Sequence, residues 1–327
     1  SYGISLRNLA LFAEKIYPSE EPMKAALKAI SVMLFKLEGQ VILRNPDYNM
    51  TDKLLLHKVN VEKQTVEIDG TEHAIKEEAF PTVNFDSGDI EDVYQLSEEE
   101  EQVMEGLRMA FVNSIRLRQH IEFLYQKGSM YRIFNGNLLY HGCVPLDEKG
   151  NFRKVKIGSK QYSGKELYDV LEYYARKGYY EQDNREEHEY GKDIMWYIWS
   201  NENSPVYGKE KMATFERYFI ADKEVQIERK DHYYRLIERE DVVNNILKEF
   251  GVDIEKGHII NGHMPVHVKE GESPVKCNGK VMIIDGGFSN TAERQELPVT
   301  PLSIIQEVCV LFLMRHLLRQ KTLSKKR

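Results

Sequence analysis

Apolar residues recur at helical spacing through the first 60 residues, which predicts helices there. The first helix has one face made of Leu9, Leu11, Phe12 and Ile16. A second helix is predicted between Glu21 and Leu43, and its apolar face consists of Ala25, Ala26, Ile30, Met33, Leu34 and Leu37. We expect both faces to pack against neighbouring helices, because an apolar stripe at this spacing is typical of a helix at the edge of a core.

Two hairpins are predicted where apolar and polar residues begin to alternate. Residues 61–75 alternate around Asp69-Gly70, and residues 130–140 flank Asn135-Gly136. Both dipeptides favour two-residue turns, because Asp, Asn and Gly tolerate the positive φ that such turns require. The second hairpin draws attention to His141, which follows its second strand directly.

Further helices are predicted between and after these hairpins. Ser97 with Glu100 is a capping-box pattern, so we expect a helix from there to about Lys127. The same pattern at Ser163 predicts a helix to about residue 177. A shorter helix over 241–250 precedes strands predicted at 258–260 and 279–285.

Composition places the chain among globular proteins, with 42% hydrophobic and 30% charged residues in 327 positions. The formal net charge of -7 argues against nucleic acid as a partner. Cys143, Cys277 and Cys309 contain no C-x-x-C pair and no disulfide framework, which favours a reducing compartment. The first residues lack both a Met and a long apolar run, so we expect a fragment without a signal peptide, located in the cytoplasm.

Two loops of similar design suggest a metal site. A predicted strand ends at Asn261-Gly262, His263 follows, and Pro265 restricts the next residues. His141 likewise follows a strand, with Gly142 beside it and a proline soon after. The alternative for each is a hydrogen-bonded structural or surface histidine. Because the design occurs twice, one metal ion bound by both imidazoles stands as an equal alternative on the pattern alone.

A short basic stretch offers candidates for phosphate binding. Lys209, Lys211 and Arg217 lie within nine residues of one another, and their side chains are donors without acceptors. The alternative is ordinary surface charge paired with Glu210 and Glu216.

Several longer phrases in the same order resemble the class III fructose-1,6-bisphosphatases, within the calcineurin-like metallophosphoesterases. These phrases are Tyr2-Gly-Ile-Ser-Leu-Arg, Leu139-Tyr-His-Gly-Cys-Val-Pro-Leu-Asp-Glu, Asn203-Ser-Pro-Val-Tyr-Gly-Lys, Thr214-Phe-Glu-Arg-Tyr-Phe and Ile283-Ile-Asp-Gly-Gly-Phe-Ser. The resemblance implies an α/β fold of two packed sheets flanked by helices. It also implies hydrolysis of the 1-phosphate of fructose 1,6-bisphosphate by water activated between two divalent metals, with Mn²⁺ as the expected ion.

The resemblance further implies that His141 and His263 ligate one ion. The family's Asp-x-His, Gly-Asp-x-x-Asp and Gly-Asn-His motifs do not occur in this sequence. The acid histidine and the other ligands would therefore belong to an amino-terminal half, which a second chain could supply. Two neutral imidazoles alone bind a cation weakly, because a two-metal site needs anionic ligands as well. We therefore expect little phosphatase activity from this polypeptide alone.

The resemblance also implies a division of the chain into three parts. Residues 1–127 form a helical and hairpin accessory region, and 128–290 form the carboxyl-terminal part of the core with an insertion at about 146–240. Residues 291–327 depart from the family pattern. One back-translation of the run after Thr300, read one base earlier, gives the family's ending, so we hypothesise a frameshift near Asn290. The alternative is an amphipathic helix over 301–320, whose apolar core is too short to span a membrane.

Two other functions stay open on the sequence alone. One is another calcineurin-like phosphoesterase, such as a protein or dinucleotide phosphatase, which would share both histidine loops. The other is a non-catalytic remnant or interaction module, which the missing motifs favour.

Overall fold

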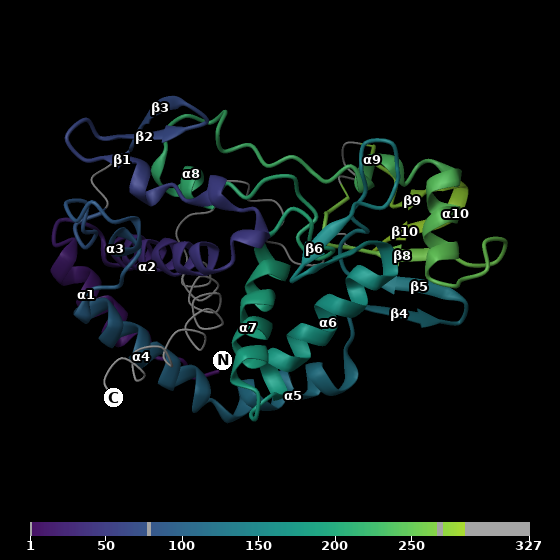
Figure 1. Cartoon of the computed structure of the whole chain (residues 1–327), viewed down its shortest axis with the longest axis horizontal. Coiled ribbons are helices and arrows are strands. Elements are labelled where there is room, and N and C mark those ends of the chain that lie inside the picture. The colour runs from purple at the N-terminus through teal and green to yellow at the C-terminus, as the bar shows by residue number, and fades with distance from the viewer. Residues whose placement is uncertain (1, 77–79, 267–270, 285–327) are drawn as a thin grey trace. The chain divides into compact units, whose positions relative to one another are not determined.

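The computed structural model describes residues 2–76, 80–266 and 271–284 (Figure 1). These residues form two compact units. The first contains 2–126 and 213–227, and the second contains 127–212 and 228–284. Residues 213–227, which were predicted to lie inside the insertion, thus belong to the first unit. Within the described ranges, no helix is both long and apolar enough to cross a membrane.

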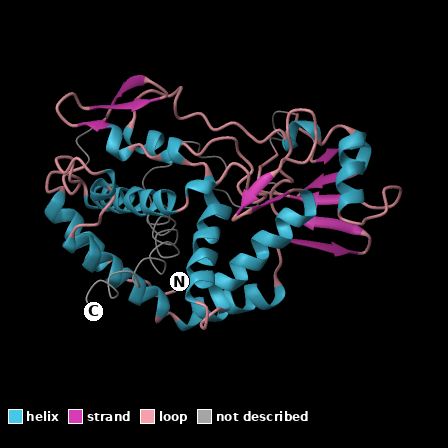
Figure 2. Cartoon of the chain, in the orientation of Figure 1, coloured by secondary structure: helices cyan, strands magenta, loops and turns pink. Residues whose placement is uncertain are grey.

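The first unit is mainly helical, with one small antiparallel sheet whose strand order is β1-β2-β3 (Figure 2). Its helices are α1 (Arg7–Ile16), α2 (Pro22–Arg44), α3 (Ile90–Val93), α4 (Glu98–Val112), α5 (Ile115–Lys127) and α8 (Thr214–Phe219). Its strands are β1 (Val59–Asn60), β2 (Thr65–Ile68) and β3 (Thr71–Ala74).

The central helix α2 confirms the predicted apolar face, since all six of its predicted residues are buried. Burial extends around the whole helix, including Leu27 and Val32, because neighbouring segments cover it on more than one side. The prediction for α1 was partly wrong. Leu9 and Phe12 are buried, but Leu11 is 56% exposed, and Ala13 takes the inward position instead.

The predicted hairpin around Asp69-Gly70 is confirmed as β2 and β3, with positive φ at both turn residues. The capping box at Ser97 and Glu100 is also confirmed. The single helix expected to continue to Lys127 was wrong, because the chain leaves helical geometry at Asn113 and Ser114 and resumes as α5. Asn and Ser are weak helix formers, and the Ser114 hydroxyl donates to the distant carbonyl of Tyr2 at 2.8 Å.

The second unit is organised around a five-stranded sheet of order β4-β5-β8-β10-β9. β5 and β10 run parallel to β8, while β4 and β9 are antiparallel edge strands. The strands are β4 (Tyr131–Phe134), β5 (Asn137–Tyr140), β8 (Ile259–Asn261), β9 (Val275–Lys276) and β10 (Val281–Ile283). A separate hairpin joins β6 (Val155–Ile157) and β7 (Lys160–Tyr162).

Helices α6 (Gly164–Tyr180), α7 (Arg185–Ser200), α9 (Tyr233–Leu236) and α10 (Glu240–Glu249) complete this unit. α10 runs beside the sheet (Figure 1), and its apolar residues share one core with those of β5, β8 and β10. The α6 helix is confirmed, but Ser163 makes no side-chain hydrogen bond to it, so the predicted capping box was wrong there. The chain is therefore a mixed α/β protein, as expected from the sequence.

Candidate metal centre

The two predicted histidines lie together because their strands are neighbours. Leu138 of β5 pairs with Ile259 of β8, and Leu139 pairs with Ile260, in parallel register. Since parallel strands end at the same edge of a sheet, the residues that follow them meet there. The backbone N–H of Gly262 donates to the carbonyl of His141 at 2.9 Å, which extends the pairing past the strand ends.

The imidazoles contact each other directly. Nε2 of His141 lies 3.0 Å from Nδ1 of His263, and the ring planes meet at 62°. Nε2 of His263 lies 2.7 Å from the backbone carbonyl of Tyr207. Because a carbonyl only accepts, we assign a proton to this Nε2, which leaves the lone pair of the neutral ring on Nδ1. The lone pair of His263 therefore faces His141.

Backbone contacts hold both histidine loops in place. His263 has a φ of +70°, which is uncommon outside glycine. The buried Asn261 donates from its amide to the carbonyl of Gly142 at 2.8 Å. Gly142 in turn lies against Pro205, since a Cβ at this position would be 2.5 Å from the Pro205 carbonyl oxygen. The segment that contains Tyr207 is thus packed tightly on the His141 loop.

The separation of the two ring nitrogens is compatible with a hydrogen bond between structural histidines and also with two ligands of one cation. At a metal–nitrogen distance of about 2.1 Å, two nitrogens lie about 3.4 Å apart at the tetrahedral angle and about 3.0 Å apart at a right angle, so the observed 3.0 Å corresponds to ligands that meet an ion at a right angle. A backbone carbonyl that fixes the far nitrogen is also a common arrangement for a ligating histidine. No group of three or more potential ligands occurs among the residues that the structure describes. Asp285, in the Ile-Asp-Gly-Gly phrase, lies outside them, as does the tail with its hypothesised frameshift.

The three predicted phosphate-binding residues belong to different units. Lys209 and Lys211 are in the second unit, whereas Arg217 is on α8 in the first. The ammonium of Lys209 is paired with the carboxylate of Glu228 at 2.6 Å, and this carboxylate is 5% exposed. Their role in binding phosphate stays a prediction, and the ion pair at Lys209 agrees with the alternative of paired charge.

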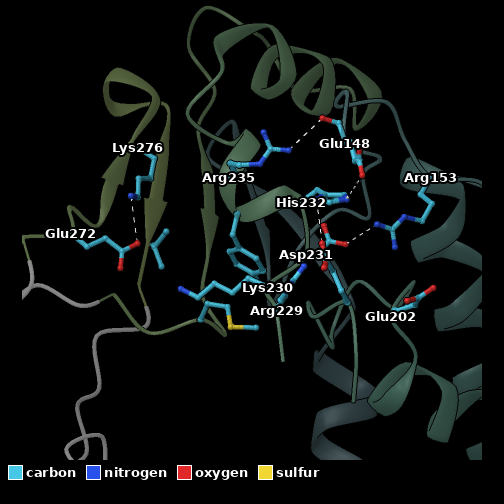
Figure 3. Close-up of a pocket in the computed structure, with 14 residues that line it drawn as sticks. Glu148, Arg153, Glu202, Arg229, Lys230, Asp231, His232, Arg235, Glu272 and Lys276 are labelled. Carbon is cyan, nitrogen blue, oxygen red and sulfur yellow. Dashed lines mark hydrogen bonds and ion pairs between the residues drawn. The ribbon is translucent and has the colours of Figure 1, made fainter. Parts of the chain in front are cut away.

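A pocket of about 770 Å³ lies in the second unit beside the histidine loops, since Met264 is part of its wall (Figure 3). Charged side chains dominate the wall. Its residues are Glu148, Arg153, Glu202, Glu210, Arg229, Lys230, Asp231, His232, Tyr234, Arg235, Met264, Glu272, Lys276 and Ile283. The buried Asp231 accepts from Arg153 at 3.2 Å. Burial raises the pKa of Asp231, and the hydrogen bond from the Tyr233 backbone and the Arg153 charge oppose that rise.

Sequence reasoning missed the pocket and the carbonyl of Tyr207. A backbone acceptor has no residue-type signature, so nothing in the sequence marks Tyr207 as a partner of His263. The adjacent cations Arg229 and Lys230 were visible as a charged run between predicted elements, and such a run is usually a solvated surface.

Comparison with known proteins identifies the family. The model for the Firmicute fructose-1,6-bisphosphatases matches residues 1–322. The class 3 fructose-1,6-bisphosphatase of Clostridium acetobutylicum is 44% identical over 98% of this chain and 50% of its own length. Relatives of the same description in Clostridium beijerinckii and Alkaliphilus metalliredigens are each 45% identical over 88% and 89% of the chain, and over 46% of their own lengths. The chain thus spans about half the length of these relatives.

No solved structure matched the chain. The family match covers nearly the whole sequence, and it confirms the resemblance drawn from the short phrases. The chain therefore belongs to the Firmicute fructose-1,6-bisphosphatase family.

Proposed function

We propose that this chain is part of a fructose-1,6-bisphosphatase in which His141 and His263 bind one divalent cation, with Mn²⁺ as the expected ion. The observation that supports this most directly is the 3.0 Å approach of their ring nitrogens at the ends of two parallel strands. The reaction would be hydrolysis of the 1-phosphate of fructose 1,6-bisphosphate, a gluconeogenic step in the cytoplasm. The complete protein would have the two-sheet metallophosphoesterase fold.

The residues of this chain would position the cation. The Tyr207 carbonyl holds the His263 ring so that Nδ1 points toward His141. A cation bound there would need a lone pair from each ring, so it would replace the hydrogen bond between them. Bound divalent cations polarise a phosphoryl oxygen and lower the pKa of a bound water. Lys209, Lys211 and Arg217 remain candidates for contacts with substrate phosphate.

Two imidazoles make an incomplete site, so the remaining ligands would come from outside this chain. The relatives are about twice as long, and we propose that the portion not matched here, supplied in the same or a second polypeptide, provides carboxylates. Without them, the chain should bind Mn²⁺ weakly and show little turnover.

Isothermal titration of the chain with Mn²⁺ tests the two ligands. We expect H141A and H263A each to weaken binding by at least about tenfold, since loss of a fixed ligand contact costs that much or more. H120A is the control, because His120 is exposed and contacts Tyr2 in the first unit. Equal Mn²⁺ affinity in H141A, H263A and the unchanged chain would refute the metal site and favour a non-catalytic role.

Phosphatase assays test the second half of the proposal. The chain alone with Mn²⁺ should release phosphate slowly, and co-expression with the amino-terminal half of the Clostridium acetobutylicum relative should restore turnover. Full turnover by the isolated chain would contradict the incomplete site. A restored enzyme that prefers phosphoproteins or dinucleotides over fructose 1,6-bisphosphate would instead indicate another phosphoesterase.

A further inference from the structure

Two cations on the wall of the charged pocket make neither an ion pair nor a side-chain hydrogen bond with any described residue. These are Arg229 and Lys230, both of which are exposed. Among the other cations of the wall, Arg235 donates to the backbone carbonyl of Glu148 at 3.5 Å, and Arg153 is paired with Asp231 at 3.2 Å. Lys276 likewise lies 3.2 Å from Glu238 and 3.5 Å from Glu272. The wall therefore has positive charge that the protein does not neutralise locally.

The acidic side chains of the pocket wall mostly have partners of their own. Glu210 lies 3.3 Å from Nδ1 of His232, and Glu148 lies 3.9 Å from Nε2 of the same ring. Glu202 forms no ion pair with described residues, and in Figure 3 it points away from Lys230, on the far side of Arg229. An anion that enters beside Lys230 would thus meet two available donors.

A short segment connects these cations to the histidine pair. The carbonyl of Tyr207 binds His263, and the carbonyl of the next residue, Gly208, accepts from the backbone of Asp231 at 3.0 Å. Two residues further on, the backbone of Glu210 donates to the carbonyl of Arg229 at 2.9 Å. Backbone hydrogen bonds from the same segment, residues 207–210, therefore position both Arg229 and His263.

We propose that Arg229 and Lys230 form an anion subsite for the phosphate group of a bisphosphorylated sugar that is not hydrolysed. This inference rests on the proposed function, because it takes the histidine pair to hold the phosphate that leaves. A guanidinium matches two phosphate oxygens at once, and an ammonium adds a point charge with three donors. The pocket volume of about 770 Å³ falls in the range of small-molecule sites.

The test is isothermal titration of the metal-free chain, in EDTA, with fructose 6-phosphate and with fructose. We expect fructose 6-phosphate to bind and fructose to give no signal. The double variant R229Q/K230Q should weaken fructose 6-phosphate binding at least about tenfold, because it removes two charge-assisted contacts. The matched control R185Q/K256Q removes one arginine and one lysine that are exposed in the same unit, and it should leave the affinity unchanged. Thermal unfolding by circular dichroism verifies that both variants fold.

The outcomes separate this inference from the proposed function. H263A should retain fructose 6-phosphate binding while losing Mn²⁺. If the chain binds Mn²⁺ but not fructose 6-phosphate, or if R229Q/K230Q binds the sugar phosphate as well as the unchanged chain, the subsite is refuted and the metal proposal stands. If the sugar phosphate binds through Arg229 and Lys230 but Mn²⁺ does not bind, the subsite is supported and the metal proposal fails.

Discussion

Substitution of Gly142 by alanine should disturb the proposed metal centre without changing either imidazole. The added Cβ would lie 2.5 Å from the Pro205 carbonyl oxygen and 3.0 Å from that of Val206. Both contacts are with backbone, which cannot rotate away as a flexible side chain can. The segment that ends at Tyr207 must therefore move away from the His141 loop.

The size of the effect follows from these distances. Ordinary contact with a Cβ begins at 3.4 Å, so the shortfall at Pro205 requires a shift of about 0.9 Å in a packed region. Such overpacking typically costs about 1–3 kcal/mol. The shift also strains the 2.9 Å hydrogen bond from Cys143 N–H to the Pro205 carbonyl, which adds up to about 1 kcal/mol. We expect G142A to lower the free energy of unfolding by about 2–3 kcal/mol.

Two measurements check this prediction. Urea unfolding gives the change in stability, and titration with Mn²⁺ should show binding at least about tenfold weaker, since the Tyr207 carbonyl no longer orients His263. The matched control is G106A on α4, where the new Cβ meets only the end of the Asn8 side chain, at 2.8 Å. That side chain can move, and alanine favours a helix over glycine, so stability should be unchanged or slightly higher. The reasoning fails if G142A matches G106A in both stability and Mn²⁺ affinity.

The remaining predictions concern buried groups. Lys36 and Glu100 form a buried ion pair at 2.7 Å. K36M or E100L alone should lower the free energy of unfolding, measured in urea, by about 3–5 kcal/mol, because each leaves one buried charge unpaired. The double variant should lower it by less than the sum of the two single effects. Strict additivity would contradict coupling of the pair. Burial raises the pKa of Cys143 and of Cys277. In the C309S variant, which keeps only these two thiols, the folded protein should react slowly with a thiol reagent at pH 8. The protein unfolded in urea should react at both thiols. Rapid reaction of either thiol in the folded state would show that its burial is wrong.

Local features of this fold could be predicted from the sequence. The Asn135-Gly136 hairpin and the capping box at Ser97 depend on neighbouring residues alone, so their signals are contained in a few positions. The break between α4 and α5 was missed because apolar spacing continues across Asn113 and Ser114. Leu11 was wrongly predicted to be buried, because helical spacing shows which residues share an apolar face but not which side of that face packs against the rest of the protein.

The candidate site could be predicted in part. That His141 and His263 meet followed from strand-end positions and from the family resemblance, although nothing in the spacing fixes the pairing of β5 with β8. The contact of His263 with Tyr207 and the pocket around Arg229 could not be predicted. Both depend on how distant segments pack, and a backbone carbonyl looks the same at every residue.

Placement of the histidines on neighbouring strands has a consequence for how the family can vary. The separation of the two rings depends on the spacing between adjacent strands, about 4.8 Å, and not on the length of chain that joins β5 to β8. The entropic cost of closing the long segment between β5 and β8 grows only with the logarithm of its length. Insertions or deletions between the strands that spare the segment from Pro205 to Tyr207 could therefore remodel the neighbouring pocket, and with it the choice of ligand, while leaving the ring-to-ring distance intact.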